Sequence, residues 1–573
     1  MFTKKAGELA VDLLLDWGID HIYGLPGDSI NHLVEQLRKD KNRIDFVQVR
    51  HEETAALAAA SYAKLTGKIG VCLSIAGPGA IHLLNGLYDA KEDGAPVLVL
   101  AGQVPSEQLG TGHFQEIHLT RMFEDVAVFN EQVASEEQLT SLLNQAIRTA
   151  YAKKGVSVLS IPDDILAKKV KDQVQENAVL IAEPEITPAE KDLSQALELL
   201  SGSEKPVILA GKGAKGAKKE LESFAEKAGA PVIVSLPGKG VIADEHPHCL
   251  GNLGLIGTKP AYQAMQEADL LILIGTSFPY TEFFPDNARC IQIDIDPAEI
   301  GKRYKVNVGL AGDAKTSLHW LNEKMERRED RTFLQTSKEN MDLWWEELKE
   351  IEQESGEPMT AQQVIPVLQE VVDSDAVLSV DVGNVTVWMT RYFKMTTDQD
   401  FLISSTLGTM GCALPGAIAA KMACPDRQVV GVSGDGGFSM VMQDFLTAVR
   451  YKLPILFVVL NNEKIGMIKY EQQQIGSVEY LTDLESFDFA QFAEICGGKG
   501  FRVEKFDDLK PAFEKAKASN APVIVDVLIE DQPPLPGKIP YEQIVSYSKH
   551  ILKKLFEEGE LDLPPVKRAL KRL

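Results

Sequence analysis

Two stretches in the last third of the chain decide the fold: VVGVSGDGGF at residues 429–438 and ILFVVLNNEK at residues 455–464. Each is an apolar run that stops on polar residues, Asp435 between glycines in the first and the pair Asn461 and Asn462 in the second. Short apolar runs separated by helical patterns are typical of a parallel sheet that is buried on both faces. Ligands of such sheets bind beyond the carboxyl ends of the strands. The two stretches therefore predict a ligand site at neighbouring strand ends.

Glycines surround Asp435, which points to a phosphate ligand. The segment Gly434-Asp435-Gly436-Gly437 leads into a predicted helix over residues 438–452. Glycines let a diphosphate approach the backbone, and the free N–H groups at a helix start attract it. Asp435, Asn462 and a backbone carbonyl at Lys464 supply hard oxygen ligands, which phosphate oxygens and water complete to a Mg²⁺ site. Either stretch alone is better explained by a capping Asp or an Asn-rich turn; together they favour the metal–diphosphate site.

The alternation of short apolar runs and helical patterns extends along the chain in three blocks. It predicts an α/β protein with three doubly wound parallel-sheet domains and a C-terminal helical tail. A charged helical stretch at about residues 322–357 bridges the second and third blocks. The predicted domains are residues 1–182, 183–340 and 341–535, with the tail at 536–573. The predicted strands lie within residues 44–49, 69–75, 95–103 and 156–162, then 206–211, 230–237, 270–276 and 290–296, then 376–383, 401–405, 429–434, 455–462 and 523–529.

Composition excludes several classes of protein. The chain has 573 residues and a formal net charge of -24, which argues against nucleic acid as a partner because phosphate binding needs clustered Lys and Arg. No apolar stretch reaches the roughly 18 residues of a membrane span. The first residues lack the cleavage site of a secretion signal. We therefore expect a cytoplasmic protein.

The GDG segment followed by the NN pair resembles the thiamine-diphosphate (ThDP) motif of the 2-oxo-acid decarboxylase and acetolactate synthase superfamily. The resemblance covers nearly the whole chain and implies a pyrimidine-binding first domain, a middle domain and a diphosphate-binding third domain. It implies that Glu52, in VRHEETAALAAASYAKLTG, activates the cofactor by a hydrogen bond to the pyrimidine N1′. It also implies that Met410, in STLGTMG, supports the bent cofactor. Out of this context, Glu52 is more often a helix cap and Met410 a core residue. Further cofactor contacts implied in the third domain are Gly383, Asn384, Gly408, Gly466 and Met467.

The middle domain carries a second nucleotide pattern. The segment PVILAGKGAKGAKKEL is a predicted strand, a glycine loop with Gly211, Lys212 and Gly213, and a predicted helix. The next strand, within residues 230–237, lacks the terminal acidic residue expected for NAD. The family resemblance instead implies FAD. Its further contacts are expected at Gly275, Phe278, Asp294 and Asp313.

The expected FAD site limits the resemblance to two groups of the superfamily, the pyruvate oxidases and the acetolactate synthases. The segment AGQVPSEQLGTGHFQE is similar to both and implies substrate contacts at Phe114 and Gln115. Met467 is typical of the synthases, which also carry a Trp where this chain has Glu471. A Glu there is typical of pyruvate oxidases, and loss of the aromatic wall weakens selection of a second 2-oxo acid. We expect a pyruvate oxidase, with an FAD-containing acetolactate synthase as the alternative.

The expected reaction is the one that the resemblance to pyruvate oxidases implies. Pyruvate loses CO₂ on ThDP, the hydroxyethyl group passes two electrons to FAD, and oxygen or a quinone reoxidises the flavin. Water or phosphate takes the acetyl group, which gives acetate or acetyl phosphate. His82 and Glu471 are candidates for moving protons or orienting substrate, although His82 is equally explained as a core histidine. A non-catalytic protein on the same fold would lack Glu52 or Asp435, and both are present.

Assembly and location follow from the resemblance and from the tail. The family builds each site from two chains, which implies a homodimer and favours a homotetramer. Apolar residues recur at helical spacing over residues 543–556, and a short basic amphipathic segment closes the chain at 566–573. Such a segment suits peripheral contact with the inner face of the cell membrane, as in quinone-linked pyruvate oxidases. The alternative is a terminal helix packed on its own subunit.

Overall fold

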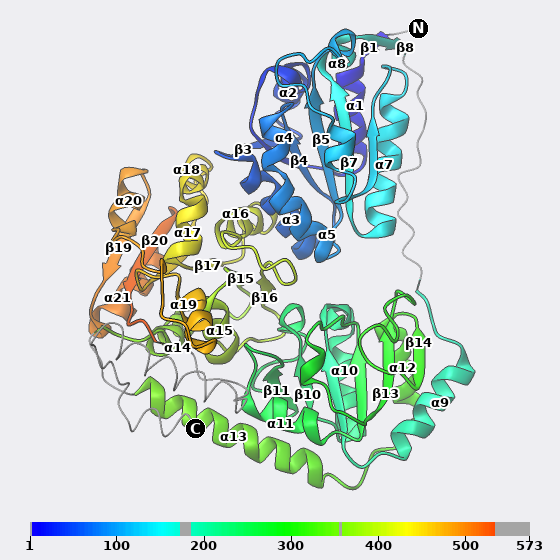
Figure 1. Cartoon of the computed structure of the whole chain (residues 1–573), viewed down its shortest axis with the longest axis vertical. Helices are drawn as coiled ribbons and strands as arrows, with labels where there is room; N and C mark the ends of the chain where they lie inside the picture. Colours follow the sequence, from blue (N-terminus) through cyan, green and yellow to red (C-terminus); the bar gives the residue numbers. More distant parts are fainter. Residues whose placement is uncertain (1–2, 172–184, 354–357, 533–573) are drawn as a thin grey trace.

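The computed structural model describes residues 3–171, 185–353 and 358–532, which form three α/β units (Figure 1). Each unit contains a six-stranded parallel sheet with helices on both faces. The expected fold class of three parallel-sheet domains is therefore confirmed. The predicted tail at 536–573 lies outside the described residues. None of the described helices is long and apolar enough to cross a membrane.

The first unit carries the sheet β3-β2-β4-β5-β7-β6. Successive residues of its central strands point to opposite faces. Leu98 and Leu100 pack beneath one helical layer, and Val97 and Val99 beneath the other. The strands are β2 His21–Gly24, β3 Asp45–Gln48, β4 Gly70–Ser74, β5 Val97–Gln103, β6 Ala127–Gln132 and β7 Val156–Pro162, with a short antiparallel pair β1 Thr3–Lys5 and β8 Lys169–Lys171. The helices are α1 Ala6–Asp16, α2 Asn31–Lys39, α3 Glu52–Thr66, α4 Pro78–His82, α5 Leu84–Glu92, α6 Leu119–Met122, α7 Leu139–Lys153 and α8 Asp163–Ala167.

The middle unit has the strand order β11-β10-β9-β12-β13-β14. Counted along the chain this is 3-2-1-4-5-6, the order of dinucleotide-binding sheets, whose ligand crevice opens between the first and fourth strands. The strands are β9 Pro206–Ala210, β10 Val232–Val234, β11 Cys249–Asn252, β12 Leu270–Ile274, β13 Arg289–Asp294 and β14 Val308–Ala311. The helices are α9 Glu190–Ser201, α10 Lys218–Ala228, α11 Lys259–Glu267 and α12 Ala314–Lys324, with a 3₁₀ segment η3 at Lys212–Ala217.

The third unit repeats the topology of the first. Its sheet is β16-β15-β17-β18-β20-β19, so both units have the order 2-1-3-4-6-5 along the chain. The strands are β15 Val377–Val380, β16 Asp400–Leu402, β17 Val429–Gly434, β18 Ile455–Asn461, β19 Lys499–Val503 and β20 Val523–Leu528. The helices are α14 Ala361–Val371, α15 Asn384–Tyr392, α16 Ala413–Ala423, α17 Asp435–Val441, α18 Phe445–Arg450, α19 Gly466–Gln474, α20 Phe489–Ile495 and α21 Phe506–Lys517.

Two helix predictions need correction. The helix expected over residues 438–452 is broken by a 3₁₀ segment, η6 Met442–Asp444, at which the Asp444 carboxylate accepts from Thr447 and from the backbone of Arg50 in the first unit. The charged stretch at 322–357 is not one helix. Its long helix, α13 Thr332–Glu352, begins only after α12 has ended at Lys324, and it spans the predicted boundary between residues 340 and 341.

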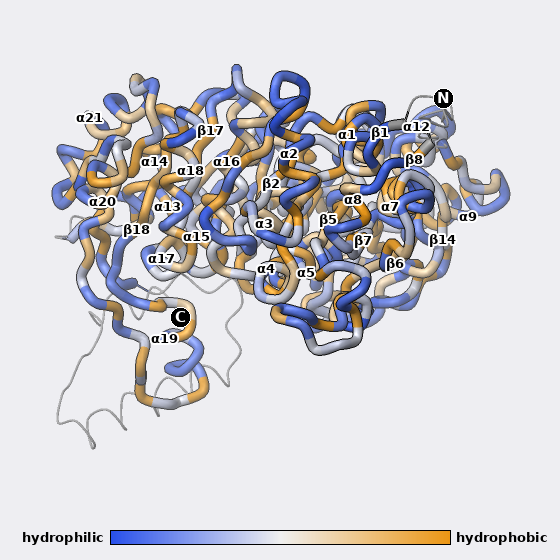
Figure 2. The backbone as a smooth tube through the Cα atoms, turned by 90° about the horizontal axis from the view of Figure 1, so that it is seen from above, coloured by the Kyte–Doolittle hydropathy of each residue, from blue (hydrophilic) through white to orange (hydrophobic). Residues whose placement is uncertain are grey.

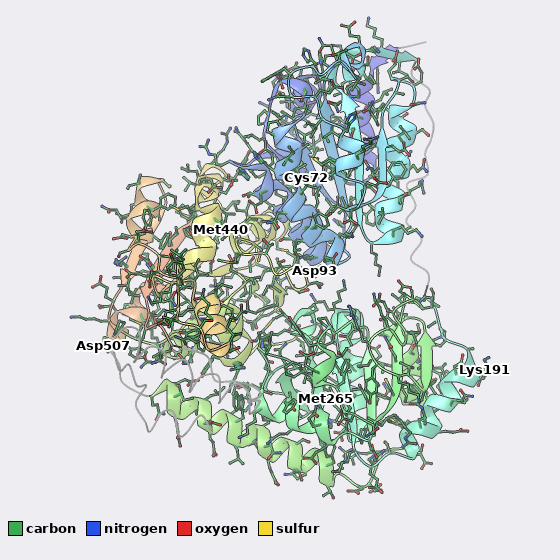
Figure 3. The ribbon with its side chains drawn as sticks, viewed as in Figure 1. Cys72, Asp93, Lys191, Met265, Met440 and Asp507 are labelled. Atoms are coloured by element: carbon green, nitrogen blue, oxygen red, sulfur yellow. The ribbon has the colours of Figure 1, made fainter. Side chains whose placement is uncertain are left out.

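Asp93 lies where the three units meet (Figure 3). Its carboxylate accepts from Ser405 Oγ at 2.6 Å and pairs with Lys64 Nζ at 2.6 Å, while its backbone carbonyl accepts from Lys212 Nζ. A second link is fully buried: Lys239 Nζ lies 2.7 Å from Asp244 Oδ2 in the middle unit and donates to a carbonyl of α15 in the third. Polar contacts therefore fix the units against one another.

Candidate cofactor site

Glu52 sits at the carboxyl edge of the first sheet as the opening residue of α3. Its residue is 5% exposed, and its Oε2 lies 2.9 Å from His82 Nδ1. The His51 ring stacks on that of His82 with 4.3 Å between centroids. A Cβ atom at position 79 would lie 2.9 Å from Glu52 Oε1, so Gly79 keeps that oxygen accessible. His82 is not a core histidine, because its side chain is 42% exposed and bonds the buried carboxylate.

The predicted substrate residues lie on a loop near this carboxylate. Phe114 is 76% exposed, and Gln115 has a φ of +65°, which non-glycine residues rarely adopt. A Cβ atom at Gly77 would come within 2.8 Å of the Gln115 carbonyl oxygen, so the loop rests on the turn before α4. Phe114 and Gln115 line a hollow together with Ala76 and Gln108. The structure thus brings the predicted substrate loop to the turn that also leads to His82.

Asp435 opens α17 in the third unit and is only 4% exposed. Its Oδ1 accepts from the backbone of Gly436 at 2.9 Å, whereas its buried Oδ2 has no hydrogen-bond partner. Burial raises the pKa of Asp435 to about 6, although backbone N–H groups of Gly436, Glu463 and Lys464 oppose the shift. A buried carboxylate oxygen without a partner is an acceptor that a cation would satisfy.

Asn384 adds a second unsatisfied oxygen near this position. Its Oδ1 is buried and has no hydrogen-bond partner, and it stands at the start of α15, one strand away from Asp435. A Cβ atom at Gly466 would lie 2.6 Å from Asn384 Nδ2 and 3.2 Å from Asn462 Nδ2, so the two amides and Gly466 form one cluster. The Lys464 ammonium pairs with Asp483, which leaves the backbone of Lys464 as its contribution to a metal. The donor set of hard oxygens fits Mg²⁺ and a diphosphate.

The loop that carries Gly408 and Met410 approaches the same turn. The Met410 methyl carbon would lie 3.4 Å from a Cβ atom at Gly436. Asp381 holds this loop: its Oδ1 accepts from the backbone of Gly411 at 2.8 Å, and its Oδ2 accepts from Ser433 Oγ at 2.9 Å. Asp381 also lies under Gly437, where a Cβ atom would come within 2.9 Å of its carboxyl carbon. We did not expect Asp381; the signal available was an acidic residue directly after the apolar run of β15.

Asp531 is a second residue that the sequence did not reveal. It accepts from Tyr470 Oη at 2.6 Å and from Asn462 Nδ2 at 3.4 Å, and it pairs with Lys469. By taking the amide N–H of Asn462, Asp531 turns the amide oxygen of that residue away from itself. No local sequence pattern marks Asp531, because its partners lie far back along the chain.

Three of the predicted flavin residues, Gly211, Gly213 and Gly275, lie together at the crevice of the middle sheet. Gly211 and Gly275 follow β9 and β12, the strands between which the order reverses. A Cβ atom at Gly213 would lie 2.7 Å from the Gly275 Cα, so only glycine allows these loops to pack. Phe278 stacks edge-on against Tyr280, and Asp294 ends β13, where burial raises its pKa.

Asp313 already has a structural role. Its side chain caps α12 by accepting from the backbone of Lys315 at 2.8 Å and of Thr316 at 3.2 Å. Its contact with FAD stays a prediction.

Glu471 and Met467 lie on α19, which projects from the body of the chain (Figure 2). Glu471 is exposed and Met467 is half-buried. Within the described part of the chain, neither side chain forms a hydrogen bond or ion pair with Glu52, His82 or Gln115. The structure therefore does not bring these two residues to the first-domain carboxylate of the same chain.

Comparison with known proteins agrees with this architecture. Residues 4–122 match the N-terminal TPP binding domain of thiamine pyrophosphate enzymes, residues 193–321 match their central domain, and residues 381–527 match their C-terminal TPP binding domain. A Bacillus subtilis protein named as thiamine pyrophosphate-containing (YdaP) is 57% identical over 573 residues, with both chains covered completely.

Two relatives with named activities are more distant. A pyruvate oxidase of Lactiplantibacillus plantarum is 37% identical over 582 aligned positions, covering 99% of this chain and 96% of the relative. An acetolactate synthase of Mycobacterium bovis is 32% identical over 540 positions, covering 90% of this chain and 86% of the relative. With three domain matches and relatives of this identity along its length, the chain belongs to the thiamine pyrophosphate enzyme family.

Proposed function

We propose that this protein is a pyruvate oxidase. It decarboxylates pyruvate, passes two electrons to FAD and then to oxygen or a quinone, and releases acetate or acetyl phosphate. The observation that carries the ThDP part is the pair of buried oxygens without partners, Asp435 Oδ2 and Asn384 Oδ1, at one edge of the third sheet. ThDP supplies an electron sink for decarboxylation when it is bound, and FAD accepts the electrons.

The residues of the chain then have distinct tasks. Asp435, Asn462 and the backbone carbonyl of Lys464 would hold Mg²⁺ and with it the diphosphate, and Gly383 and Gly434 leave open space beside them. Glu52 holds a proton at the pyrimidine ring, with His82 as its hydrogen-bond partner at 2.9 Å. Burial of Glu52 strengthens that interaction because the low local dielectric favours a paired carboxylate. Phe114 and Gln115 orient pyruvate and exclude water.

Two observations support an FAD site in the middle unit. Its strand order is the dinucleotide-binding one, and the crevice between β9 and β12 is lined by Gly211, Gly213 and Gly275. A glycine-lined crevice allows the close approach of a pyrophosphate, whereas Phe278 is only 6% exposed and packs against Tyr280. The choice of an oxidase rests on Glu471 in place of an aromatic wall, and on 37% identity to a pyruvate oxidase against 32% to an acetolactate synthase.

A second candidate is an FAD-containing acetolactate synthase, which Met467 favours. Turnover with pyruvate separates the two when acetate, acetyl phosphate, peroxide and acetolactate are measured together, with and without phosphate and a quinone. We expect acetate or acetyl phosphate to dominate. Acetolactate as the main product would reject the oxidase and leave the synthase.

We also propose that the enzyme is a homodimer or homotetramer. Large apolar side chains are exposed around both halves of the site: Ile81 is 48%, Phe114 76% and Met440 54% exposed. Met440 lies on α17 beside the diphosphate turn (Figure 3). A second copy that covers these side chains would remove them from water and bring a first domain to a third domain. Sedimentation of the holoenzyme tests this; a stable, active monomer would reject it.

The location proposed is the cytoplasm, with peripheral contact of the tail at the inner face of the cell membrane. This proposal rests on the basic amphipathic pattern of residues 566–573, which lie outside the described residues. Deletion of residues 559–573 should abolish binding to anionic vesicles while leaving activity with a soluble dye acceptor unchanged. Absence of vesicle binding by the full chain at low salt would reject the membrane contact.

A further inference from the structure

Asp444 is a buried carboxylate that joins the third domain to the segment carrying Glu52. It is 0% exposed and ends the 3₁₀ segment η6, shortly after the diphosphate turn at Asp435. Its Oδ1 accepts from the backbone N–H of Arg50 at 2.7 Å, and its Oδ2 accepts from Thr54 Oγ1 at 2.7 Å. Glu52 lies midway between Arg50 and Thr54 in the sequence. The Asp444 carboxylate therefore holds the chain on both sides of Glu52.

The surrounding contacts make this arrangement rigid. Thr447 Oγ1 donates to Asp444 Oδ1 at 2.8 Å, which fixes the rotamer of the carboxylate from its own side. Burial raises the pKa of Asp444, and the donors from Arg50, Thr54 and Thr447 oppose that shift. Charge-assisted hydrogen bonds of this kind are about twice as strong as neutral ones.

A neighbouring contact provides a natural comparison. Tyr451, on the same side of the third domain, accepts from the backbone N–H of Gln48 at 2.7 Å and donates to the carbonyl of Phe46 at 2.9 Å. Figure 1 shows α18 beside β3, where these contacts form. The tyrosine holds the strand, whereas Asp444 holds the turn and the first helical residues that follow it.

We propose that Asp444 is a positioning residue for Glu52: it fixes the α3 start so that the Glu52 carboxylate meets the pyrimidine ring of ThDP in productive geometry. Asp444 touches neither substrate nor cofactor and acts through Arg50 and Thr54. The proposal rests on the proposed function, because it assigns Glu52 its role there. A misplacement of about 1 Å at such a group costs on the order of 100-fold in rate.

The first test measures amide hydrogen exchange in the cofactor-free protein. In Asp444→Ala the Arg50 amide should exchange about tenfold faster or more, since a hydrogen bond to a charged acceptor is lost. The Gln48 amide should be unaffected. The matched control Tyr451→Phe should do the reverse: the Gln48 amide should exchange faster, and the exchange rate of the Arg50 amide should not change. Unchanged exchange at Arg50 in folded Asp444→Ala would overturn the proposal.

The second test measures CO₂ release from pyruvate, a step that the oxidase and the synthase share. Asp444→Ala should lower kcat by about 10- to 100-fold while the KM for pyruvate and the FAD content stay unchanged. Asp444→Asn, which keeps one oxygen for Arg50, should recover most of the rate. Normal kcat in Asp444→Ala would overturn the proposal.

A gentler pair of variants covers the case in which Asp444→Ala does not fold. Thr54→Val removes one donor without changing side-chain shape, and Thr54→Ser restores the hydroxyl. The valine variant should lose about tenfold in kcat and the serine variant little; equal rates would overturn the proposal. If the wild-type enzyme releases no CO₂ from pyruvate, the proposed function fails, whereas the exchange measurements still decide whether Asp444 holds the turn.

Discussion

The two halves of the cofactor site differ in how their polar atoms are satisfied. In the first domain, Glu52 Oε2 already has a partner within the chain, the His82 ring at 2.9 Å. In the third domain, Asp435 Oδ2 and Asn384 Oδ1 are buried and have none. The first half is thus paired within the chain, whereas the second leaves two buried acceptors that a cation would satisfy. The domains share one strand order, so the difference arises from the side chains at the strand ends.

The largest expected effect comes from breaking the third-domain half. In Asp435→Ala the protein loses the proposed metal-binding carboxylate, so retention of Mg²⁺ and ThDP should fall by at least about 100-fold. FAD content should stay the same, because the proposed flavin site lies in the middle domain. Metal analysis of the purified protein measures the retained Mg²⁺, and chromatography of the released cofactors measures the retained ThDP and FAD.

Asp507→Ala is the control for loss of a negative charge on the third domain, since Asp507 is exposed on α21 at the far end of that domain (Figure 3). It should retain all cofactors. Parallel loss of ThDP and FAD in Asp435→Ala would mean misfolding or a wrong domain assignment.

A substitution in the first-domain half of the cofactor site should lower turnover without lowering the retention of ThDP and FAD. Glu52→Gln keeps the shape of the side chain but removes its charge, so kcat should fall at least about 100-fold while folding, ThDP and FAD content persist. Glu53→Gln is the matched control: Glu53 bonds Asn85 at 2.6 Å and has no proposed part in the chemistry. Near-normal turnover of Glu52→Gln would remove Glu52 from the mechanism.

The pH dependence of the cofactor-free protein sharpens the comparison. The pKa of Asp435 is raised to about 6 in the folded protein from an ordinary value of 3.8. The folded state therefore holds a proton that the unfolded state has released, and the free energy of unfolding falls as pH rises from about 4 to 6. The shift corresponds to about 3 kcal/mol at about 1.36 kcal/mol per pKa unit.

Asp435→Asn has no titrating carboxyl group at this position, so its free energy of unfolding should not fall in this pH range. Without Mg²⁺ the variant should therefore be more stable than the wild type at pH 7 by up to about 3 kcal/mol. With Mg²⁺ and ThDP the order should reverse, because the neutral amide of Asn binds the cation more weakly than the carboxylate does. Denaturant unfolding at pH 5 and pH 7.5, with and without Mg²⁺, measures both. A wild type that is more stable than the variant under all four conditions would contradict the burial of an unpaired carboxylate.

The smallest effect is expected at the substrate loop. Gly77 has φ +64° and ψ -116°, and a Cβ atom there would lie 2.8 Å from the Gln115 carbonyl oxygen. Gly77→Ala should cost about 1–3 kcal/mol of stability and raise the KM for pyruvate by displacing Phe114 and Gln115, without loss of ThDP.

Gly67→Ala is the control for backbone strain alone, because Gly67 has φ +70° and open space around its Cα. It should lower stability and leave KM unchanged. Equal KM values in the two variants would show that the loop does not depend on Gly77.

The sequence allowed the sheet interiors to be predicted better than their edges. The long apolar strands, such as β5 and β18, lie buried in sheet centres and stand out as continuous apolar runs. Strands β6, β11, β14 and β19 were missed; they lie at sheet edges, and most are interrupted by polar residues or glycine. The four-residue strand β2 was also missed, although it pairs on both sides.

The site shows the same division between local and distant signals. Asp435 and Asn462 follow apolar strands directly, so their proximity at one sheet edge followed from parallel topology. The roles of Asp444 and Asp531 depend on partners that are distant in the sequence. Asp444 accepts from Arg50, hundreds of residues away, and Asp531 accepts from Asn462, tens of residues away. Such contacts leave no periodic pattern in the chain and require the packed domains to be seen.

Parallel pairing also governs how this chain reaches its native state. Within the described residues, every neighbouring pair in the three six-stranded sheets is parallel. No pair can form through a two-residue hairpin, so each one waits for a crossover of a dozen or more residues to close. Folding of such sheets is slow and leaves unpaired strand edges exposed to other chains. The net charge of -24 opposes those encounters by repulsion, a protection that weakens as salt screens it.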